Sequence, residues 1–357
     1  MLATAALVSE LPRSLLGGTP AGLMENVLAM GGFLAAYVLV SLPFDLTGGY
    51  LLPRAFKRSR QPFIEFVLAW LRGVFVQSFV MLAAALLILW AGRNWGVAGA
   101  VIAVAALMLF TIALQVELAR LTARLPRSSV RPSAGAITLP DRALVLDAAD
   151  EGFVGGYSGL PGSVRLVIPA RWLTHLPSPL LQAQLLRRLS ALSDGTRSRG
   201  ILVAFGWNLL GFTLCAFAPG SGVTAMAGIA TLALWFTLWS FLGLLILPTP
   251  SRAGVFEADH AAIRRGVSIE NLQSTIQQLD RWQDDEPSRS PGIEAIFHPV
   301  PSVASRLTRL QRSARAFGAW HAARLALPLS WPCLGLLARS VHCNTGRPEL
   351  WVLLPGD

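Results

Sequence analysis

Histidine, carboxylate and arginine residues are the side chains that could carry chemistry in this chain. The histidines are His175, His260, His298, His321 and His342, and no two of them are four residues apart. A helix that binds zinc for hydrolysis needs imidazoles at i and i+4, so that both reach one metal from one face, and a carboxylate that deprotonates the bound water. The sequence contains no such set.

Two smaller clusters could in principle hold a metal. Glu257, Asp259 and His260 lie close together, and His342 is followed by Cys343. Adjacent residues point to different sides of a helix, so we expect solvated or locally hydrogen-bonded groups, with a rebuilt metal site as the alternative. The glycines of 152–162 form neither a Walker loop nor a dinucleotide fingerprint, which argues against nucleotide binding.

Composition predicts that the chain is a membrane protein. It is 53% hydrophobic and 14% charged, with a mean hydropathy of +0.53. In soluble domains, charged residues alone make up about a quarter. Five windows are long and apolar enough to cross a bilayer, namely about 27–44, 73–91, 95–115, 201–218 and 223–247. A further apolar run, 325–338, is too short to span and is expected to be interfacial or packed.

Arginine-rich segments predict the orientation of these spans. Basic residues follow the first span at 54–60 and the third at 120–131. Because basic loops are retained in the cytoplasm, we expect an outside N-terminus, five spans and cytoplasmic soluble parts, in a bacterial inner membrane. The net charge is +10, and the arginines that carry it border the spans. No aromatic residues interleave with them in the manner of an RNA-binding motif. The lipid bilayer is therefore an expected partner, and nucleic acid is not.

The segments outside the spans predict a small α+β domain in a mainly α, polytopic helical membrane protein. Four short β-rich pieces, 136–139, 143–146, 152–157 and 164–168, predict an antiparallel sheet. A helix is expected from Ser178, the proposed N-cap, to Ser193, and later helices at 251–266, 270–282 and 302–325. The predicted regions are a membrane region at 1–125, the sheet and helix at 126–199, a transmembrane hairpin at 200–248 and a helical region at 249–357.

This order of elements resembles the membrane zinc metalloproteases that include the HtpX heat-shock protease and the type I CAAX prenyl protease. In that family one helix carries HExxH and a second carries SRxxExxAD. Ser251, Arg252, Ala258 and Asp259 match the second motif, which is the most specific part of the resemblance. Weaker matches are Leu42-Pro43-Phe44, 152–156, Ser178-Pro179, and His298-Pro299 followed by Arg306-Leu307. The resemblance implies a gluzincin-like soluble domain.

The departures from this family's pattern concern its zinc site. Arg187 and Ala191 stand where the zinc histidines belong, Arg188 where the general base belongs, and Val255 where the glutamate ligand belongs. An arginine stays protonated and presents only hydrogen-bond donors, so it replaces neither ligand nor base. We therefore expect no intact catalytic residue, no metal and no cofactor.

The function expected from the resemblance and its departures is non-catalytic. We expect a binding or regulatory role on membrane protein segments or on an active protease paralogue. One alternative is an active membrane metalloendopeptidase with an unrecognised zinc site. Another is a structural or transport-linked membrane protein, whose mark would be paired charges inside the spans, where the sequence shows only Asn208.

In the family the aspartate of the second motif orients a ligand histidine, so its counterpart Asp259 needs another partner here. A guanidinium can meet a buried carboxylate with charge-assisted hydrogen bonds. We expect Arg187 or Arg188 to pair with Asp259 or Glu257 in place of the metal. The alternative is that both arginines point into solvent.

Overall fold

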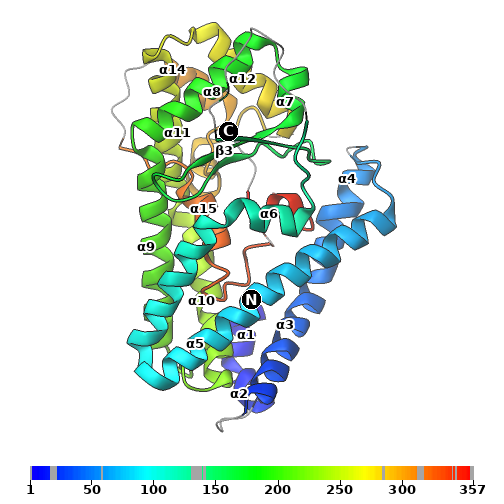
Figure 1. Cartoon of the computed structure of the whole chain (residues 1–357), viewed down its shortest axis with the longest axis vertical. Coiled ribbons are helices and arrows are strands. Elements are labelled where there is room, and N and C mark those ends of the chain that lie inside the picture. Colours follow the sequence, from blue (N-terminus) through cyan, green and yellow to red (C-terminus); the bar gives the residue numbers. More distant parts are fainter. Residues whose placement is uncertain are drawn as a thin grey trace. The chain divides into compact units, whose positions relative to one another are not determined.

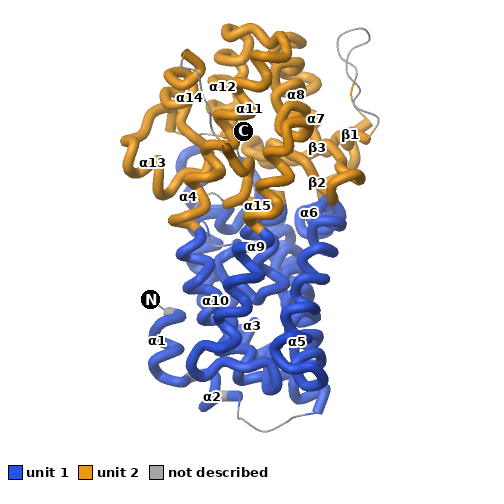
Figure 2. The backbone as a smooth tube through the Cα atoms, turned by 90° about the vertical axis from the view of Figure 1, so that its left-hand side faces the viewer, with its two compact units in different colours: residues 1–124, 205–243, 326–352 blue, residues 125–204, 244–325, 353–357 orange. Residues whose placement is uncertain are grey.

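A computed structural model describes residues 2–16, 22–57, 59–129, 139, 142–283, 286–311, 317–339, 341 and 344–353. The chain divides into two compact units, each assembled from separate stretches of sequence (Figure 2). The membrane unit comprises 1–124, 205–243 and 326–352. The sheet unit comprises 125–204, 244–325 and 353–357.

The membrane unit is helical, and the described residues contain four helices long and apolar enough to cross a membrane: 23–55, 63–113, 196–216 and 226–246. The protein is therefore a multi-pass integral membrane protein. The helices of this unit are α1 (Leu2–Val8), α2 (Leu11–Leu16), α3 (Leu23–Leu46), a π-helix (Thr47–Leu51), α4 (Leu52–Ala55), α5 (Phe63–Ala113), α6 (Gln115–Ala123) and a 3-10 helix (Pro348–Leu350). Helices α9 (Thr196–Ala216) and α10 (Met226–Ile246) belong partly to each unit.

Helix α5 contains both the second and the third predicted windows. Figure 1 shows it as two arms that meet at a turn. Gly96 has non-helical dihedrals inside it, φ 63° and ψ −156°. Glycine has no Cβ and adopts this positive φ without a steric penalty, which lets a continuous apolar sequence reverse direction.

The interior of the membrane unit holds a charged pair. Arg339 Nη2 lies 3.4 Å from Asp45 Oδ2, and Trp70 Nε1 donates to the same oxygen at 3.0 Å. Arg339 also donates to Ser41 Oγ, and its guanidinium lies 4.7 Å from the ring of Tyr37. Neither member of the pair lies inside a predicted span. Asp45 lies one residue past the first predicted window, and its partner is far away in the sequence.

The sheet unit contains β1 (Ala143–Leu146), β2 (Gly156–Ser158) and β3 (Arg165–Pro169), in the order β1-β3-β2. Strand β2 pairs with β3 antiparallel, but β1 pairs with β3 parallel, so the predicted all-antiparallel sheet was wrong. The stretch between β1 and β3 is long enough for the crossover that a parallel pair requires. The predicted strand 136–139 lies outside the described residues, apart from Leu139.

The sheet unit also contains helices (Figure 1). They are α7 (Ala170–His175), α8 (Ser178–Ser193), α11 (Pro248–Arg264), α12 (Ile269–Gln283), α13 (Pro291–Phe297), α14 (Val303–Leu310) and α15 (Ala322–Leu329), which ends in the membrane unit. Helix α8 has the predicted bounds, although its N-cap is Pro177 and not Ser178. The predicted helix 302–325 is interrupted, since residues 317–319 are not helical. Helix α8 packs against both α11 and α12.

Candidate functional site

Three helices of the sheet unit meet at the carboxylate of Asp259. Arg187 on α8 donates from Nε to Asp259 Oδ1, and Asp259 itself lies on α11. Arg306 on α14 donates from Nε to Oδ2 at 2.9 Å and from Nη2 to Oδ1 at 2.7 Å. The bidentate geometry of Arg306 matches the fork that guanidinium and carboxylate groups favour. We call these three residues the arginine clamp.

The arginine clamp is buried, with Arg187 fully inaccessible and Asp259 and Arg306 nearly so. Burial alone would raise the pKa of Asp259, but the charges and hydrogen bonds of Arg187 and Arg306 outweigh it and lower the pKa below its ordinary value. The carboxylate is therefore ionised at neutral pH. It satisfies the requirement that a buried charge be paired and hydrogen-bonded.

Arg188 points the other way, towards the sheet. Its Nη2 donates to the carbonyl oxygen of Val154 at 2.7 Å, and its Nη1 to that of Val167 at 3.2 Å. Its guanidinium carbon lies 4.4 Å from the ring of Trp172. Arg188 is as buried as Arg187, so neither arginine points into solvent. Arg188 is thus a permanent cation that holds α8 to the sheet.

Glu257 takes no part in the arginine clamp. Its carboxylate accepts from Arg199 Nη2 at 2.6 Å and from the backbone N–H of Gly318 at 2.9 Å. His260 places Nδ1 2.9 Å from the carbonyl oxygen of Phe256, one turn earlier on α11. The sequence cluster of Glu257, Asp259 and His260 is therefore divided among separate partners.

A metal site is not evident elsewhere in the described sequence, where no three His, Cys, Asp or Glu side chains gather in a way that could hold a metal ion. His342 and Cys343 lie outside the described residues. The described cysteines, Cys215 and Cys333, are free thiols.

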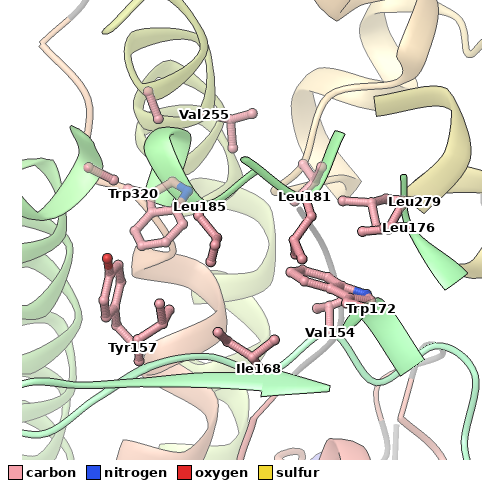
Figure 3. Packing of buried hydrophobic residues seen from close by; sticks show 14 residues of the cluster. Val154, Tyr157, Ile168, Trp172, Leu176, Leu181, Leu185, Val255, Leu279 and Trp320 are labelled. Carbon is pink, nitrogen blue, oxygen red and sulfur yellow. The ribbon is translucent and has the colours of Figure 1, made fainter. Parts of the chain in front are cut away.

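The remaining two family positions, Ala191 and Val255, lie in the hydrophobic core of the sheet unit (Figure 3). Their cluster includes Trp172, Leu185 and Trp320, and both are almost fully buried. In Figure 3, Val255 and Leu185 lie among these aromatic side chains. Apolar packing thus occupies two of the four positions where the family resemblance requires polar groups.

The other retained residues of the second motif have structural partners. Ser251 Oγ accepts from the backbone N–H of Ala323 at 2.9 Å and donates to the carbonyl oxygen of Leu247 at 2.8 Å. Arg252 Nε lies 3.9 Å from Glu294 Oε1. Ala258 belongs to the same hydrophobic cluster as Val255. In the described structure the motif therefore anchors α11 to neighbouring segments.

The solved structures that are similar to this chain include one that aligns with most of it. The crystal structure of S. mikatae Ste24p aligns with a TM-score of 0.68 over 84% of this chain and 78% of that one, at 14% sequence identity. The chain has a Ste24-like fold. No protein-family model and no curated protein sequence matches it. At this identity the likeness concerns the fold alone.

The Ste24-like fold raises the question of whether the residues present fit a zinc ion. They do not. Zinc is held by imidazole, thiolate or carboxylate donors, whereas the four positions that the family resemblance assigns to its zinc site carry two guanidinium groups and two aliphatic side chains. Asp259, the carboxylate of the SRxxExxAD-like motif, has both oxygens engaged by arginines.

Arg306 is the member of the arginine clamp that sequence reasoning missed. The sequence places it on the predicted helix 302–325 and in a weak His-Pro…Arg match, and indicates no partner for it. The signal was its phase on α14, where Val303, Arg306 and Leu310 are the buried residues. An arginine at a position that should be apolar in an amphipathic helix predicts a buried carboxylate partner.

Proposed function

We propose that this protein is a non-catalytic membrane protein with a Ste24-like fold, in which the arginine clamp takes the structural place of a zinc centre. The observation that carries the proposal is the double engagement of Asp259 by Arg187 and Arg306. In this proposal the cytoplasmic soluble parts bind membrane protein segments, or modulate an active protease paralogue.

Electrostatics support the loss of metal binding. A dication placed beside Arg187 and Arg188 would meet two buried positive charges, and charge repulsion is strong where water is excluded. Arg187 cannot deprotonate to become a ligand, because a guanidinium stays protonated in proteins. Arg188 cannot act as a general base for the same reason.

The way in which the buried groups are paired and packed without a metal also supports the proposal. Removing a structural or catalytic metal usually leaves its ligands and their supporting groups unpaired in a buried site. Here the supporting carboxylate has two cationic partners, and the neighbouring positions are filled by Ala191 and Val255 in a packed core. The site is thus stabilised as it stands, which is what a binding module requires.

The decisive test is zinc content measured together with peptidase activity. Purified protein, dialysed without chelator, is expected to contain far less than one zinc per chain and to cleave no unfolded membrane substrate. Zinc at about one per chain, removed by a chelator together with an activity, would refute the proposal and favour the metalloendopeptidase alternative.

The regulatory role has its own test. An active metalloprotease of the same membrane is co-reconstituted with this protein, and its cleavage rate is compared with that in vesicles containing an unrelated multi-pass protein. A change specific to this protein supports regulation. An unchanged rate, together with no cross-linking between the two proteins, would exclude that paralogue as the partner.

A further inference from the structure

Helix α13 exposes apolar side chains and buries its carboxylate. Ile293, Ile296 and Phe297 are 54%, 44% and 53% exposed, whereas Glu294 is only 1% exposed. The three apolar residues stand at i, i+3 and i+4, so they form one face of the helix. This is the reverse of a helix that packs on a protein core and faces water.

The buried carboxylate fixes this orientation. Glu294 Oε2 accepts from the backbone N–H of Ser302 at 3.1 Å, from Ser302 Oγ at 2.5 Å and from Ser305 Oγ at 3.0 Å. Turning the helix to bury its apolar face would break all three hydrogen bonds. The exposed apolar face is therefore held in place by the fold.

Exposed apolar side chains are concentrated on this short helix. Outside the candidate spans, the described part of the sheet unit exposes few large apolar residues, namely Ile269, Ile293, Ile296, Phe297 and Phe317. Most of them lie on α13. A clustered apolar face of this kind marks a surface with a partner, since single exposed residues are the norm elsewhere.

The position of α13 identifies that partner. Helix α10 has 21 residues, and at 1.5 Å per residue it is about 32 Å long, close to the thickness of a hydrocarbon core. It ends at Ile246, which is itself 46% exposed, and α11 begins at Pro248. Thr249 Oγ1 donates to the carbonyl oxygen of Ala295 on α13 at 3.4 Å. Helix α13 thus lies beside the chain three residues beyond the end of a candidate span.

We propose that α13 is a membrane-surface helix whose Ile293, Ile296 and Phe297 insert among phospholipid acyl chains at the boundary of the bilayer. Helices of this kind lie in the interface with their apolar face in the acyl region. Ile246, at the end of α10, belongs to the same compact unit as α13. The sheet unit therefore contacts lipid directly, as well as through its spans.

Site-specific photo-cross-linking tests this contact in the full chain. A photoreactive phenylalanine analogue replaces Phe297, and in separate variants Ile293, Leu202 or Glu270, and the protein is reconstituted in vesicles of phosphatidylcholine and phosphatidylglycerol. Leu202 is 70% exposed on the candidate span α9 and is the positive control. Glu270, exposed beyond the far end of α11, is the negative control.

The expected result is a phospholipid adduct at Phe297 and Ile293 with a yield similar to that at Leu202. The variant at Glu270 should form little or no adduct. Ile296→Asp should lower the yield at Phe297, because a charge opposes insertion. Equal yields at Phe297 and Glu270 would overturn the proposal. So would cross-linking of Phe297 to a second copy of the chain instead of lipid. These outcomes do not depend on whether the protein binds zinc.

Discussion

Arg187 on α8 and Asp259 on α11 form a buried ion pair across seventy-two residues of sequence. The pair joins α8 to α11 within the sheet unit. Arg306, on a third helix, forms an ion pair with the same carboxylate. Both partners are inaccessible to water, so each depends on the other for its charge to be compensated.

Asp259→Asn should destabilise the protein by about 3–5 kcal/mol, because it leaves two buried guanidinium groups without their carboxylate. Thermal unfolding in detergent measures the effect. The matched control is Glu151→Gln, which affects a 71% exposed carboxylate 3.6 Å from the partly exposed Arg171. The control should shift stability by less than about 1 kcal/mol. Equal melting temperatures for wild type and Asp259→Asn would rule out a stabilising clamp.

The stabilisation by Asp259 should depend on pH only in acid. Its pKa in the folded chain is lowered by Arg187 and Arg306, whereas in the unfolded chain it is about 3.9. A lowered folded pKa contributes stability above the unfolded pKa, and this contribution is lost as pH falls through the folded pKa. The stability difference between wild type and Asp259→Asn should stay constant from neutral pH to about pH 4 and shrink below it. A difference that already declines between pH 7 and 5 would contradict this assignment.

Arg188→Lys should cost about 1–3 kcal/mol, because an ammonium cannot reach both carbonyl oxygens and stack on Trp172 as the planar guanidinium does. Amide hydrogen exchange should also rise in β3, where Val167 lies. Arg281→Lys is the control, since Arg281 is exposed and pairs with Gln278 on its own helix. The idea fails if both substitutions have the same small effect.

The charged pair in the membrane unit should behave as a coupled unit. Asp45→Asn and Arg339→Gln should each destabilise the protein by about 3–5 kcal/mol, since each leaves the other charge buried without its counterion. The double variant should be less destabilised than the sum of the two, by about 0.5–3 kcal/mol. Strict additivity would mean that the two groups do not interact, and would remove this pair as support for a structural or transport-linked role.

The predicted orientation can be tested with reporters. A fusion after Asp357 should be active as a cytoplasmic reporter, and one inserted within 219–222, between α9 and α10, should be active only outside the cytoplasm. The expectation rests on the basic segments at 54–60 and 120–131. The reverse pattern at both sites would show that the chain has the opposite orientation in the membrane.

Local sequence features predicted the helical parts of the fold well. The bounds of α8 followed from the Ser178-Pro179 start and the spacing of Leu181 and Leu185, because helix periodicity and termini are local properties. Each apolar window overlaps a helix for the same reason, although 95–115, 201–218 and 223–247 extend past the helix ends. The direction of β1 relative to β3 could not be predicted, since it depends on the path of the connection between them.

Long-range partners were the least predictable part of the site. The choice of Asp259 over Glu257 depends on side-chain direction: Asp259 points into the core, while Glu257 meets Arg199. The Arg306 and Arg339 contacts come from segments distant in sequence, and no local pattern encodes which carboxylate they meet. A cation in a buried helical phase indicates that a partner exists but does not name it.

The packing of Ala191 and Val255 in the core has an evolutionary consequence. A chain with this arrangement cannot acquire a metal centre at these positions one substitution at a time. Val255→Glu alone would bury an unpaired carboxylate among aromatic side chains, and Arg187→His alone would take away one of the two arginines that hold Asp259. Each first step lowers stability before any later step can restore a function. A metal centre at these positions would therefore require several simultaneous substitutions.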